Sequence, residues 1–417
     1  MLSTENFALH IRFTFSPDPP LSVAAGNCSD VHSCQLPYKY SALKEVPTVA
    51  VLGSGGGLRA MISFLGSMSG FHEAGLLDCV TYLCGVSGST WAISSLYENA
   101  EWSSDFAATI SQICSNLEDA NFDFDDIIDV LKREEHLLKR LEAAAYKEDY
   151  SATDLWGTVV SRVLGKEHNQ KLSKQQEAVK NGHNPYPVYA AINKEYFDCD
   201  KKNKHPEIWF EFTPYECGFP SYGAFVETKL FGSKFEGSEM KEYHPEPSVY
   251  LLQEKKKIFA FIGNTSSQDP KHVGHNPFVS LVDAGLEINT AYPLMLRAER
   301  KVDVIISLDF SEGDLFETLI HATEYAKVNC LRFPPVNINK NLPTDCCVYS
   351  DPVTPTVIHM PLANSANVNE MNMSEFPTKK MKYNKAEIAK LYKEAKNNIT
   401  RNKTKILEEI KKKMHSL

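Results

Sequence analysis

The chain has 417 residues and a net charge of −9 at neutral pH, with 43% apolar and 23% charged residues. This length and composition predict a soluble globular protein with at least one large hydrophobic core. The ten cysteines show no Cys-x-x-Cys spacing, and no apolar run reaches the roughly eighteen residues that a membrane span needs. We therefore expect no disulfide scaffold, zinc site, secretory leader or transmembrane helix.

Residues 1–47 contain Pro17, Pro19 and Pro20 and show no sustained hydrophobic period, which predicts a loosely ordered N-terminal extension. From residue 48 onward, apolar strand-like runs alternate with helical patterns. We predict strands at 48–52, 80–84, 278–282 and 302–308, and helices at 59–74 and 90–97. Such alternation is typical of an α/β fold in which helices cover both faces of a mostly parallel sheet.

Two long regions interrupt this pattern. Residues 101–180 have a helical period with charged faces, which predicts helices that flank the sheet. Residues 236–277 are polar and contain prolines, which predicts loops and a few short strands. We interpret the second region as an excursion from the main domain rather than a domain of its own.

The first strand runs into a glycine-rich turn, Gly-Ser-Gly-Gly-Gly-Leu-Arg at 53–59. A dinucleotide fingerprint would need a third glycine near Leu58, and a phosphate-binding P-loop would end in Gly-Lys-Ser or Gly-Lys-Thr. Both nucleotide interpretations are therefore poor. The alternatives that remain are a turn that only allows close packing, and an oxyanion hole made by the N–H groups of Gly56 and Gly57, with positive charge from Arg59.

The second strand ends in Gly-Val-Ser-Gly-Ser at 85–89, which is close to the Gly-x-Ser-x-Gly elbow of serine hydrolases. A sharp turn between strand and helix needs small neighbours and exposes the serine oxygen at a helix N-terminus. This placement favours Ser87 as a nucleophile. Ser89 is the neighbouring candidate, and we expect it to cap the following helix.

A nucleophilic serine needs a base, and none of the thirteen histidines stands at a recognisable strand end beside glycine. Asp283 does, because it follows the apolar run 278–282 and precedes Ala-Gly. It could accept the Ser87 proton directly in a Ser-Asp dyad. The alternative for Asp283 is a turn-forming or capping role, and the second carboxylate at a strand end is Asp309.

The last segment, 379–417, carries thirteen Lys or Arg residues against four Glu. Its apolar residues recur mostly at steps of three and four, which predicts a basic C-terminal helix. Two interpretations stay open for this helix. It packs on the core with a solvated basic face, or that face contacts anionic lipid headgroups.

Three motifs together resemble the group IV cytosolic phospholipases A2: the glycine turn with Ala60 after it, Gly-Val-Ser-Gly-Ser-Thr-Trp at 85–91, and Val-Asp-Ala-Gly-Leu at 282–286. The resemblance covers most of the chain from residue 48. It extends to Tyr-Ser-Ala-Thr-Asp-Leu-Trp at 150–156, Pro-Tyr-Pro at 185–187, Trp-Phe-Glu-Phe-Thr-Pro at 209–214, Phe-Gly-Ser-Lys-Phe at 231–235 and Ser-Leu-Asp-Phe-Ser at 307–311.

The resemblance implies one catalytic domain at 48–417, a three-layer α/β/α fold related to patatin, with a cap that is reduced because 236–277 is short. It implies Ser87 as nucleophile, Asp283 as base, and Gly56 and Gly57 as the oxyanion hole. It places Arg59 beside the substrate phosphate. A further family arginine near the mouth of the site matches Arg300, which the resemblance implies as a second anion-binding residue.

The implied function is a phospholipase A2 or lysophospholipase that hydrolyses acyl esters of glycerophospholipids through an acyl-enzyme. The chain is most similar to the gamma type, since the motifs begin about 48 residues in and leave no room for a C2 domain. We expect no cofactor, metal, calcium requirement or nucleic-acid partner. The chain ends without a Cys box, so we expect a cytosolic protein that contacts intracellular membranes peripherally. The alternatives are an esterase of shorter acyl substrates and an inactive lipid-binding protein or splice form with a shortened cap.

Overall fold

The computed structural model describes residues 46–119, 170–194, 197, 206–236, 239–246, 258–259, 278–279, 281–338 and 344–414. The predicted extension at 1–47 therefore lies almost wholly outside the described residues, as does most of the excursion at 236–277. Of the helical region at 101–180, the described parts are 101–119 and 170–180.

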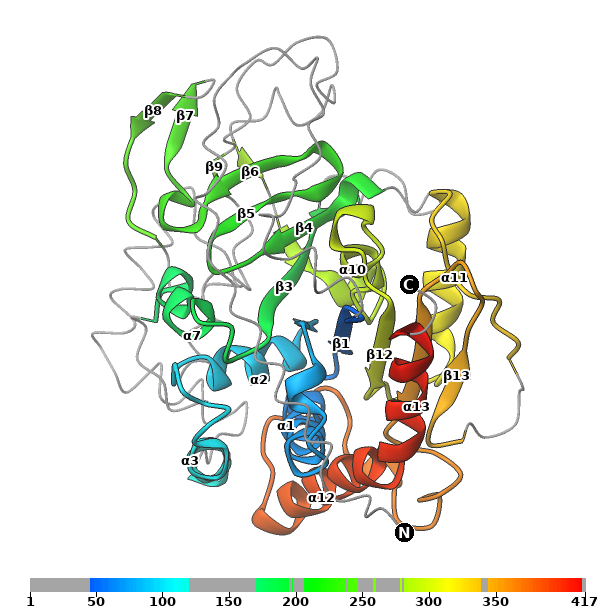
Figure 1. Cartoon of the computed structure of the whole chain (residues 1–417). Helices are drawn as coiled ribbons and strands as arrows, with labels where there is room; N and C mark the ends of the chain where they lie inside the picture. The colour runs from blue at the N-terminus through cyan, green and yellow to red at the C-terminus, as the bar shows by residue number, and fades with distance from the viewer. Residues whose placement is uncertain are drawn as a thin grey trace.

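A ten-stranded mixed sheet forms the centre of the molecule (Figure 1), in the order β13-β14-β12-β1-β2-β3-β4-β5-β6, with β11 paired to β3. Its strands are β1 (Val49–Gly53), β2 (Tyr82–Gly85), β3 (Tyr186–Asn193), β4 (Trp209–Phe212), β5 (Glu216–Phe219), β6 (Ala224–Glu227), β11 (Leu281–Asp283), β12 (Val304–Asp309), β13 (Cys347–Tyr349) and β14 (Thr356–Pro361). Two small ribbons pair β7 (Lys234–Glu236) with β8 (Glu239–Glu242), and β9 (Ile258–Phe259) with β10 (Phe278–Val279).

The described helices lie around this sheet. They are α1 (Gly57–Glu73), α2 (Gly88–Leu96), α3 (Phe106–Asp119), α7 (Gln176–Val179), α10 (Tyr292–Met295), α11 (Glu317–Val328), α12 (Lys385–Arg401) and α13 (Lys403–Met414). The predicted strands at 48–52, 80–84 and 302–308 and both predicted helices are confirmed to within two residues at each end. Among the described helices, none has the length and apolar character needed to cross a bilayer.

The predicted α/β class is confirmed, but the sheet is parallel only at its centre. β14, β12, β1, β2 and β3 pair in parallel, whereas β13 at one edge and β4, β5 and β6 at the other are antiparallel. For β5 and β6 the physical reason is connection length. Only a few residues separate β4 from β5 and β5 from β6, and parallel neighbours need a crossover of a dozen or more residues.

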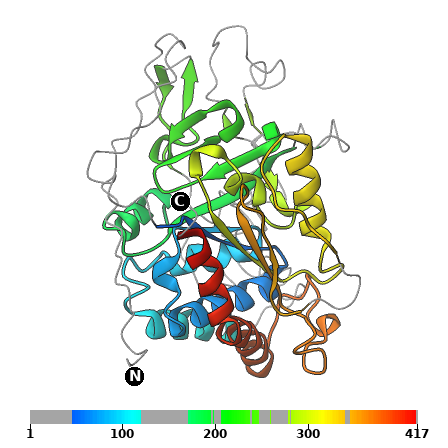
Figure 2. The same ribbon diagram turned by 45° about the vertical axis from the view of Figure 1, so that its right-hand side comes forward.

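Alternate residues of the central strands face two separate apolar cores. In β1, Val49 and Val51 belong to the core that holds α1, α2 and α12, and Ala50 and Leu52 belong to the core that holds α10 and α11. Figure 2 shows α11 in yellow on the side of the sheet away from the blue and red helices. A strand buried on both faces reads as an unbroken apolar run, and the result is the predicted three-layer α/β/α arrangement.

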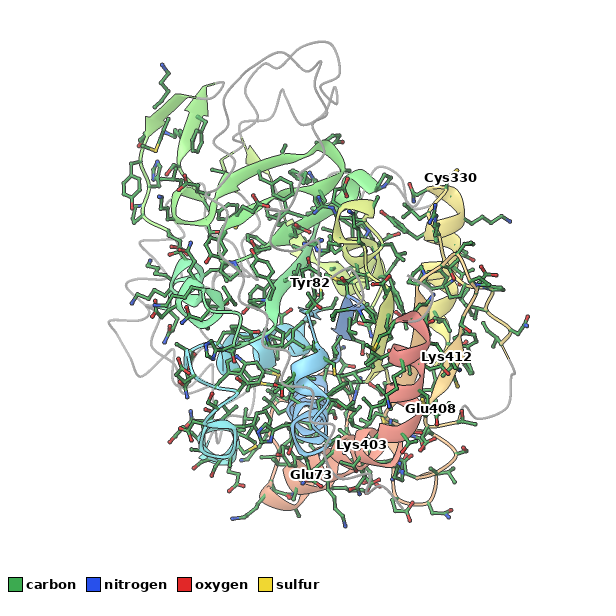
Figure 3. All side chains as sticks on the ribbon, viewed as in Figure 1. Glu73, Tyr82, Cys330, Lys403, Glu408 and Lys412 are labelled. Atoms are coloured by element: carbon green, nitrogen blue, oxygen red, sulfur yellow. The ribbon has the colours of Figure 1, made fainter. Side chains whose placement is uncertain are left out.

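The C-terminal basic segment forms α12 and α13. Asn384 and Glu387 make a reciprocal capping box at the start of α12. The apolar face of the two helices is buried in the same core as α1, while Lys403 and Lys412 are exposed (Figure 3). These helices thus pack on the domain and still present a basic surface.

The prediction of one apolar strand at 278–282 is wrong. β10 pairs with β9, and the separate strand β11 pairs antiparallel with β3. Along one edge of β3, β2 pairs as far as Gly85 with Tyr189, and β11 takes over with Asp283 opposite Ala191. β11 fills the edge that β2 leaves unpaired, so Asp283 arrives beside the turn that follows β2.

Candidate active site

Ser87 stands at the turn between β2 and α2. Its φ of 50° and ψ of −121° make it one of three non-glycine residues with positive φ in the described part of the chain. Such a conformation costs about 1–3 kcal/mol and is typical of a nucleophile elbow. The side chain is partly buried and makes no capping bond to α2.

The glycine turn packs directly against this elbow. A Cβ added to Gly88 would lie 1.9 Å from the carbonyl oxygen of Gly57, so only glycine fits there. A Cβ added to Gly55 would lie 3.1 Å from the Ser87 Cβ. The turn and the serine are therefore held in contact by the lack of side chains at these positions.

The amide groups of the glycine turn divide into two sets. Ser54 N donates to Leu308 O at 3.0 Å, and Gly55 N donates to Asn289 O at 3.0 Å. Gly56 and Gly57 have φ of 144° and 60°, and among the described residues their N–H groups have no backbone acceptor outside α1. Gly57 also opens α1, where N–H groups have no intrahelical partner. These two amides are available to an anion.

Asp283 meets Ser87 at the end of β11. Its Oδ1 accepts a hydrogen bond from Gly285 N at 2.8 Å. Loss of hydration raises the pKa of the Asp283 carboxyl, and hydrogen bonds from Gly285 N–H and the Ser87 hydroxyl lower it, with a net rise. The residue as a whole is exposed, so the loss of hydration concerns the carboxyl group itself. The arrangement joins a hydroxyl, a carboxyl hydrogen-bonded to it, and two amides without a backbone acceptor outside α1 among the described residues.

Arg59 lies beneath the turn and is 1% exposed. Its Nε donates to Phe310 O at 2.8 Å, and its Nη atoms reach Glu312, Phe376 O and Thr378. A Cβ on Gly56 would lie 2.7 Å from Nη2. Burial lowers the pKa of Arg59, and Glu312 opposes that effect. Arg59 therefore ties three segments together behind the turn, and its predicted contact with phosphate stays a prediction.

Arg300 lies in a different environment from that expected. Its Nη atoms hold both carboxylate oxygens of Glu211, at 2.9 and 3.0 Å, and one also donates to Leu294 O. The guanidinium stands over the ring of Tyr82, which Figure 3 labels near the middle of the molecule. Burial disfavours the charged guanidinium and lowers its pKa. The Glu211 carboxylate has the larger effect, so the pKa of Arg300 is raised overall. Its described partners are thus structural, and its role in anion binding stays a prediction.

Ser89 and Asp309, the neighbouring serine and the second carboxylate at a strand end, make other contacts. Ser87, not Ser89, is at the N-cap of α2, so the expected capping role of Ser89 is wrong; its buried hydroxyl donates to Ser54 O at 2.6 Å. Asp309, at the end of β12, is fully buried. One of its oxygens accepts from Ser311 N at 2.8 Å, and the other lies 3.9 Å from His359 Nε2.

Sequence reasoning missed Asn289. Its side-chain Nδ2 donates to Gly55 O at 3.3 Å and to Ser311 Oγ at 2.9 Å. Because Asn289 is six residues after Asp283, it links the loop of the proposed base to the glycine turn. Nothing in the local sequence signals a contact across more than 230 residues of chain.

The overall arrangement, a parallel-centred sheet between helical layers with a serine on a strained strand-to-helix turn, is that of the patatin-like α/β class. Human GIVD cytosolic phospholipase A2 superposes on the chain with a TM-score of 0.74 at 27% identity, over 89% of this chain and 61% of that structure. A structure of that protein in complex with methyl gamma-linolenyl fluorophosphonate superposes with a TM-score of 0.72 at 29% identity, over 89% and 60%.

Residues 49–268 match the protein family described as the lysophospholipase catalytic domain. Human cytosolic phospholipase A2 gamma is 30% identical over 496 residues, which cover 88% of this chain and 89% of that protein. Mouse cytosolic phospholipase A2 zeta is 32% identical over 438 residues, 77% of this chain and 49% of that protein. The chain belongs to the lysophospholipase catalytic domain family. It spans about half the length of the zeta relatives.

Proposed function

We propose that the chain is a phospholipase A2 or lysophospholipase that hydrolyses an acyl ester of a glycerophospholipid. The observation that carries the proposal is the strained Ser87, hydrogen-bonded to Asp283 and packed against two free glycine amides. A nucleophile, a base and an oxyanion stabiliser are the three parts that acyl transfer needs.

In the acylation step, the Ser87 Oγ attacks the ester carbonyl carbon while Asp283 takes the hydroxyl proton. The carbonyl oxygen becomes an oxyanion, which the N–H groups of Gly56 and Gly57 stabilise. Collapse of this intermediate breaks the ester C–O bond. The leaving lysophospholipid oxygen takes the proton back from Asp283, and the acyl group stays on Ser87.

Deacylation repeats the sequence with water. Asp283 accepts a proton from the water, whose oxygen attacks the acyl carbon, and the same amides stabilise the second oxyanion. The Ser87 oxygen then leaves and recovers its proton from Asp283 as the fatty acid departs. Because the protein supplies nucleophile, base and oxyanion donors, we expect the reaction to survive a calcium chelator.

The surface around the site suits a lipid substrate. Leu286, three residues after Asp283, is 60% exposed and offers an apolar contact near the site. The basic faces of α12 and α13 offer exposed lysines to anionic headgroups. We propose that Arg59 adds positive charge behind Gly56, where a phosphate oxygen would lie, and that the protein acts peripherally at phospholipid membranes.

Labelling with a fluorophosphonate tests the serine directly. We expect the wild type to label stoichiometrically, Ser87→Ala not to label, and Asp283→Asn to label at least a hundredfold more slowly, because the base is lost. Absence of label on folded wild-type protein, or full labelling of Ser87→Ala, contradicts the proposal.

Two control variants match these changes. Ser95→Ala removes a buried hydroxyl from the same helix as the elbow. Asp351→Asn alters a carboxylate that accepts from the N–H two residues on, as Asp283 does, but in a remote turn. Both are expected to label at the wild-type rate.

Substrate class is tested by comparing phosphatidylcholine vesicles with short-chain soluble esters, with calcium and with a chelator. Faster hydrolysis of vesicle lipid in both media supports the proposed function. A preference for the soluble ester identifies an esterase of shorter acyl substrates instead, and hydrolysis of neither identifies a lipid-binding protein without activity.

A further inference from the structure

Two serines outside the proposed dyad lie between the elbow and the glycine turn. β1 and β2 end side by side, with Gly53 opposite Gly85 and Val86 N donating to Gly53 O at 3.1 Å. Ser54 follows the end of β1, and Ser89 lies in the first turn of α2. Both serines are 0% exposed, so neither is open to a substrate. Any effect that they have on the reaction passes through the residues that they hold.

The Ser89 hydroxyl joins the two turns. Its Oγ donates to Ser54 O at 2.6 Å. Gly53 leaves room for this contact, because a Cβ at that position would lie 2.6 Å from Ser89 Oγ. The elbow motif of serine hydrolases has glycine where this chain has Ser89. A glycine there would leave the buried Ser54 O without this donor, so the fifth residue of the motif supplies a hydrogen bond here.

The peptide unit between Ser54 and Gly55 is thereby held from two sides. Its oxygen accepts from Ser89 Oγ on the helix that follows the nucleophile. Its nitrogen donates to Asn289 O at 3.0 Å on the loop that follows the proposed base. A peptide unit is planar, so fixing its oxygen and its nitrogen sets the direction in which the chain enters Gly56. The next N–H along the chain is that of Gly56, one of the two proposed oxyanion donors.

The Ser54 side chain fixes the same turn to the end of β12. Its Oγ accepts from Phe310 N at 2.7 Å and donates to Gly55 O at 3.3 Å, and Ser54 N donates to Leu308 O at 3.0 Å. Gly53 is the last residue of β1 that pairs with β12, opposite Leu308. The bonds of Ser54 thus extend the attachment of β1 to β12 up to the point where the oxyanion amides begin.

We propose that Ser89 and Ser54 are positioning residues, which set the amides of Gly56 and Gly57 at the distance and angle from Ser87 that an oxyanion requires. This role rests on the proposed function. An oxyanion donor is effective when it is already directed at the place where charge develops, and loss of one donor costs about a hundredfold to a thousandfold in rate. Displacement of donors that stay present costs less, so we expect kcat to fall roughly tenfold to a hundredfold without these serines.

The first test is Ser89→Ala, with Ser94→Ala as its matched control. Both serines are buried on α2 and donate to a carbonyl, but Ser94 Oγ donates to Trp91 O at 3.0 Å within the helix itself. Hydrolysis of dihexanoyl phosphatidylcholine below its micelle concentration gives kcat and KM. We expect Ser89→Ala to lower kcat roughly tenfold to a hundredfold and to change KM less than about twofold, and Ser94→Ala to leave both at the wild-type values.

Two ligands separate a displaced oxyanion hole from a loosened protein. With a short-chain trifluoromethyl ketone, the Ser87 oxygen bonds to the carbonyl carbon, Asp283 takes the hydroxyl proton, and the carbonyl oxygen becomes an oxyanion at the amides. The diether analogue of the phospholipid has no carbonyl and forms no oxyanion. We expect Ser89→Ala to weaken binding of the ketone roughly tenfold and to keep the affinity for the diether within about twofold of wild type.

Ser54→Ala tests the second attachment and whether both serines act on one turn. Because the two changes release the same turn, we expect Ser54→Ala/Ser89→Ala to lose no more than about threefold in kcat beyond the more severe single variant. Ser54→Ala also leaves Phe310 N without its acceptor, which lowers stability. Thermal unfolding is therefore measured for each variant, and all rates are taken below the onset of its unfolding.

Three results overturn the positioning role: a wild-type kcat in Ser89→Ala, a parallel loss of affinity for the ketone and the diether, and a double variant whose loss equals the product of the two single losses. Each is measured against a wild type that hydrolyses the lipid and labels with fluorophosphonate, so the positioning role can fail while the proposed function stands. A folded wild type that does neither overturns the proposed function, and the positioning role with it.

Discussion

Asn289 makes hydrogen bonds to both backbone groups of Gly55. The Asn289 carbonyl accepts from Gly55 N at 3.0 Å, and the Asn289 Nδ2 donates to Gly55 O at 3.3 Å. The same Nδ2 donates to Ser311 Oγ at 2.9 Å. Because Asn289 belongs to the loop that begins at Asp283, this contact fixes the distance between the proposed base and the proposed oxyanion hole.

Asn289→Asp is expected to lower kcat by roughly a hundredfold with a small change in KM, because the carboxylate cannot donate to Gly55 O and the turn loses its position. Steady-state kinetics and the rate of fluorophosphonate labelling measure this effect. Asn329→Asp, which alters an amide bonded to Tyr325 O at the end of α11, is the control and should leave kcat unchanged. If an Asn289 variant loses stability in proportion to activity, the role of Asn289 is structural only.

Gly88→Ala is expected to abolish labelling, since its Cβ would lie 1.9 Å from Gly57 O and would push the glycine turn away from the elbow. The expected loss of stability is about 1–3 kcal/mol, as for other overpacked sites. Gly75→Ala is the matched control, because Gly75 has a φ of 66° but open space around its Cβ position. It should cost stability through backbone strain alone and label normally. Thermal unfolding and labelling are measured on both.

The pH dependence of kcat/KM reports the ionisation of Asp283. The base must be deprotonated to accept the Ser87 proton, so activity falls as the pH falls through the Asp283 pKa. Loss of hydration at the carboxyl raises this pKa above the 3.8 of an unperturbed Asp carboxyl. We expect the acidic limb of the profile to show an apparent pKa above that value. An apparent pKa at or below 3.8 would contradict the net rise of the Asp283 pKa.

Asp283→Asn is expected to stabilise the protein near neutral pH. A folded-state pKa above the unfolded value means that the ionised carboxyl is less favourable in the fold than in the unfolded chain. Its stability contribution is therefore present at low pH and is lost as the pH rises through the folded pKa. Asn stays neutral, so the gain in Tm should grow with pH and vanish in acid. A Tm lower than wild type at pH 7 would exclude this account.

The sequence was enough to predict the parts of the site that depend on local pattern. Apolar runs located β1, β2 and β12, and the glycines around Ser87 predicted a sharp turn. The close approach of Gly88 to Gly57 explains the glycine at position 88. Asp283 was identified from its place at the end of an apolar run, although the strand there is shorter and runs antiparallel to β3.

The missing parts depend on contacts between distant segments. β11 pairs antiparallel with the part of the β3 edge that β2 leaves free, beyond the Gly85–Tyr189 pair. No local period in the sequence encodes this pairing. Arg59 is predicted to supply positive charge from the first turn of its helix, but no local pattern shows that it is buried by the segment at 376–378, more than 300 residues later. The pairing of Glu211 on β4 with Arg300 is also a contact between distant segments, and no local pattern predicts it.

The Glu211–Arg300 pair supplies a last prediction. Both side chains are largely buried, and Arg297 also reaches Glu211 at 3.0 Å. Arg300→Met leaves the Glu211 carboxylate with only Arg297, and breaking a buried pair on one side costs about 3–5 kcal/mol. Glu211→Met/Arg300→Met removes both charges and should cost less than Arg300→Met alone, because Arg297 is partly exposed and can be hydrated. Urea unfolding of the three proteins tests the pair. If Arg300 instead binds substrate phosphate, both variants lose activity equally while the single variant keeps wild-type stability.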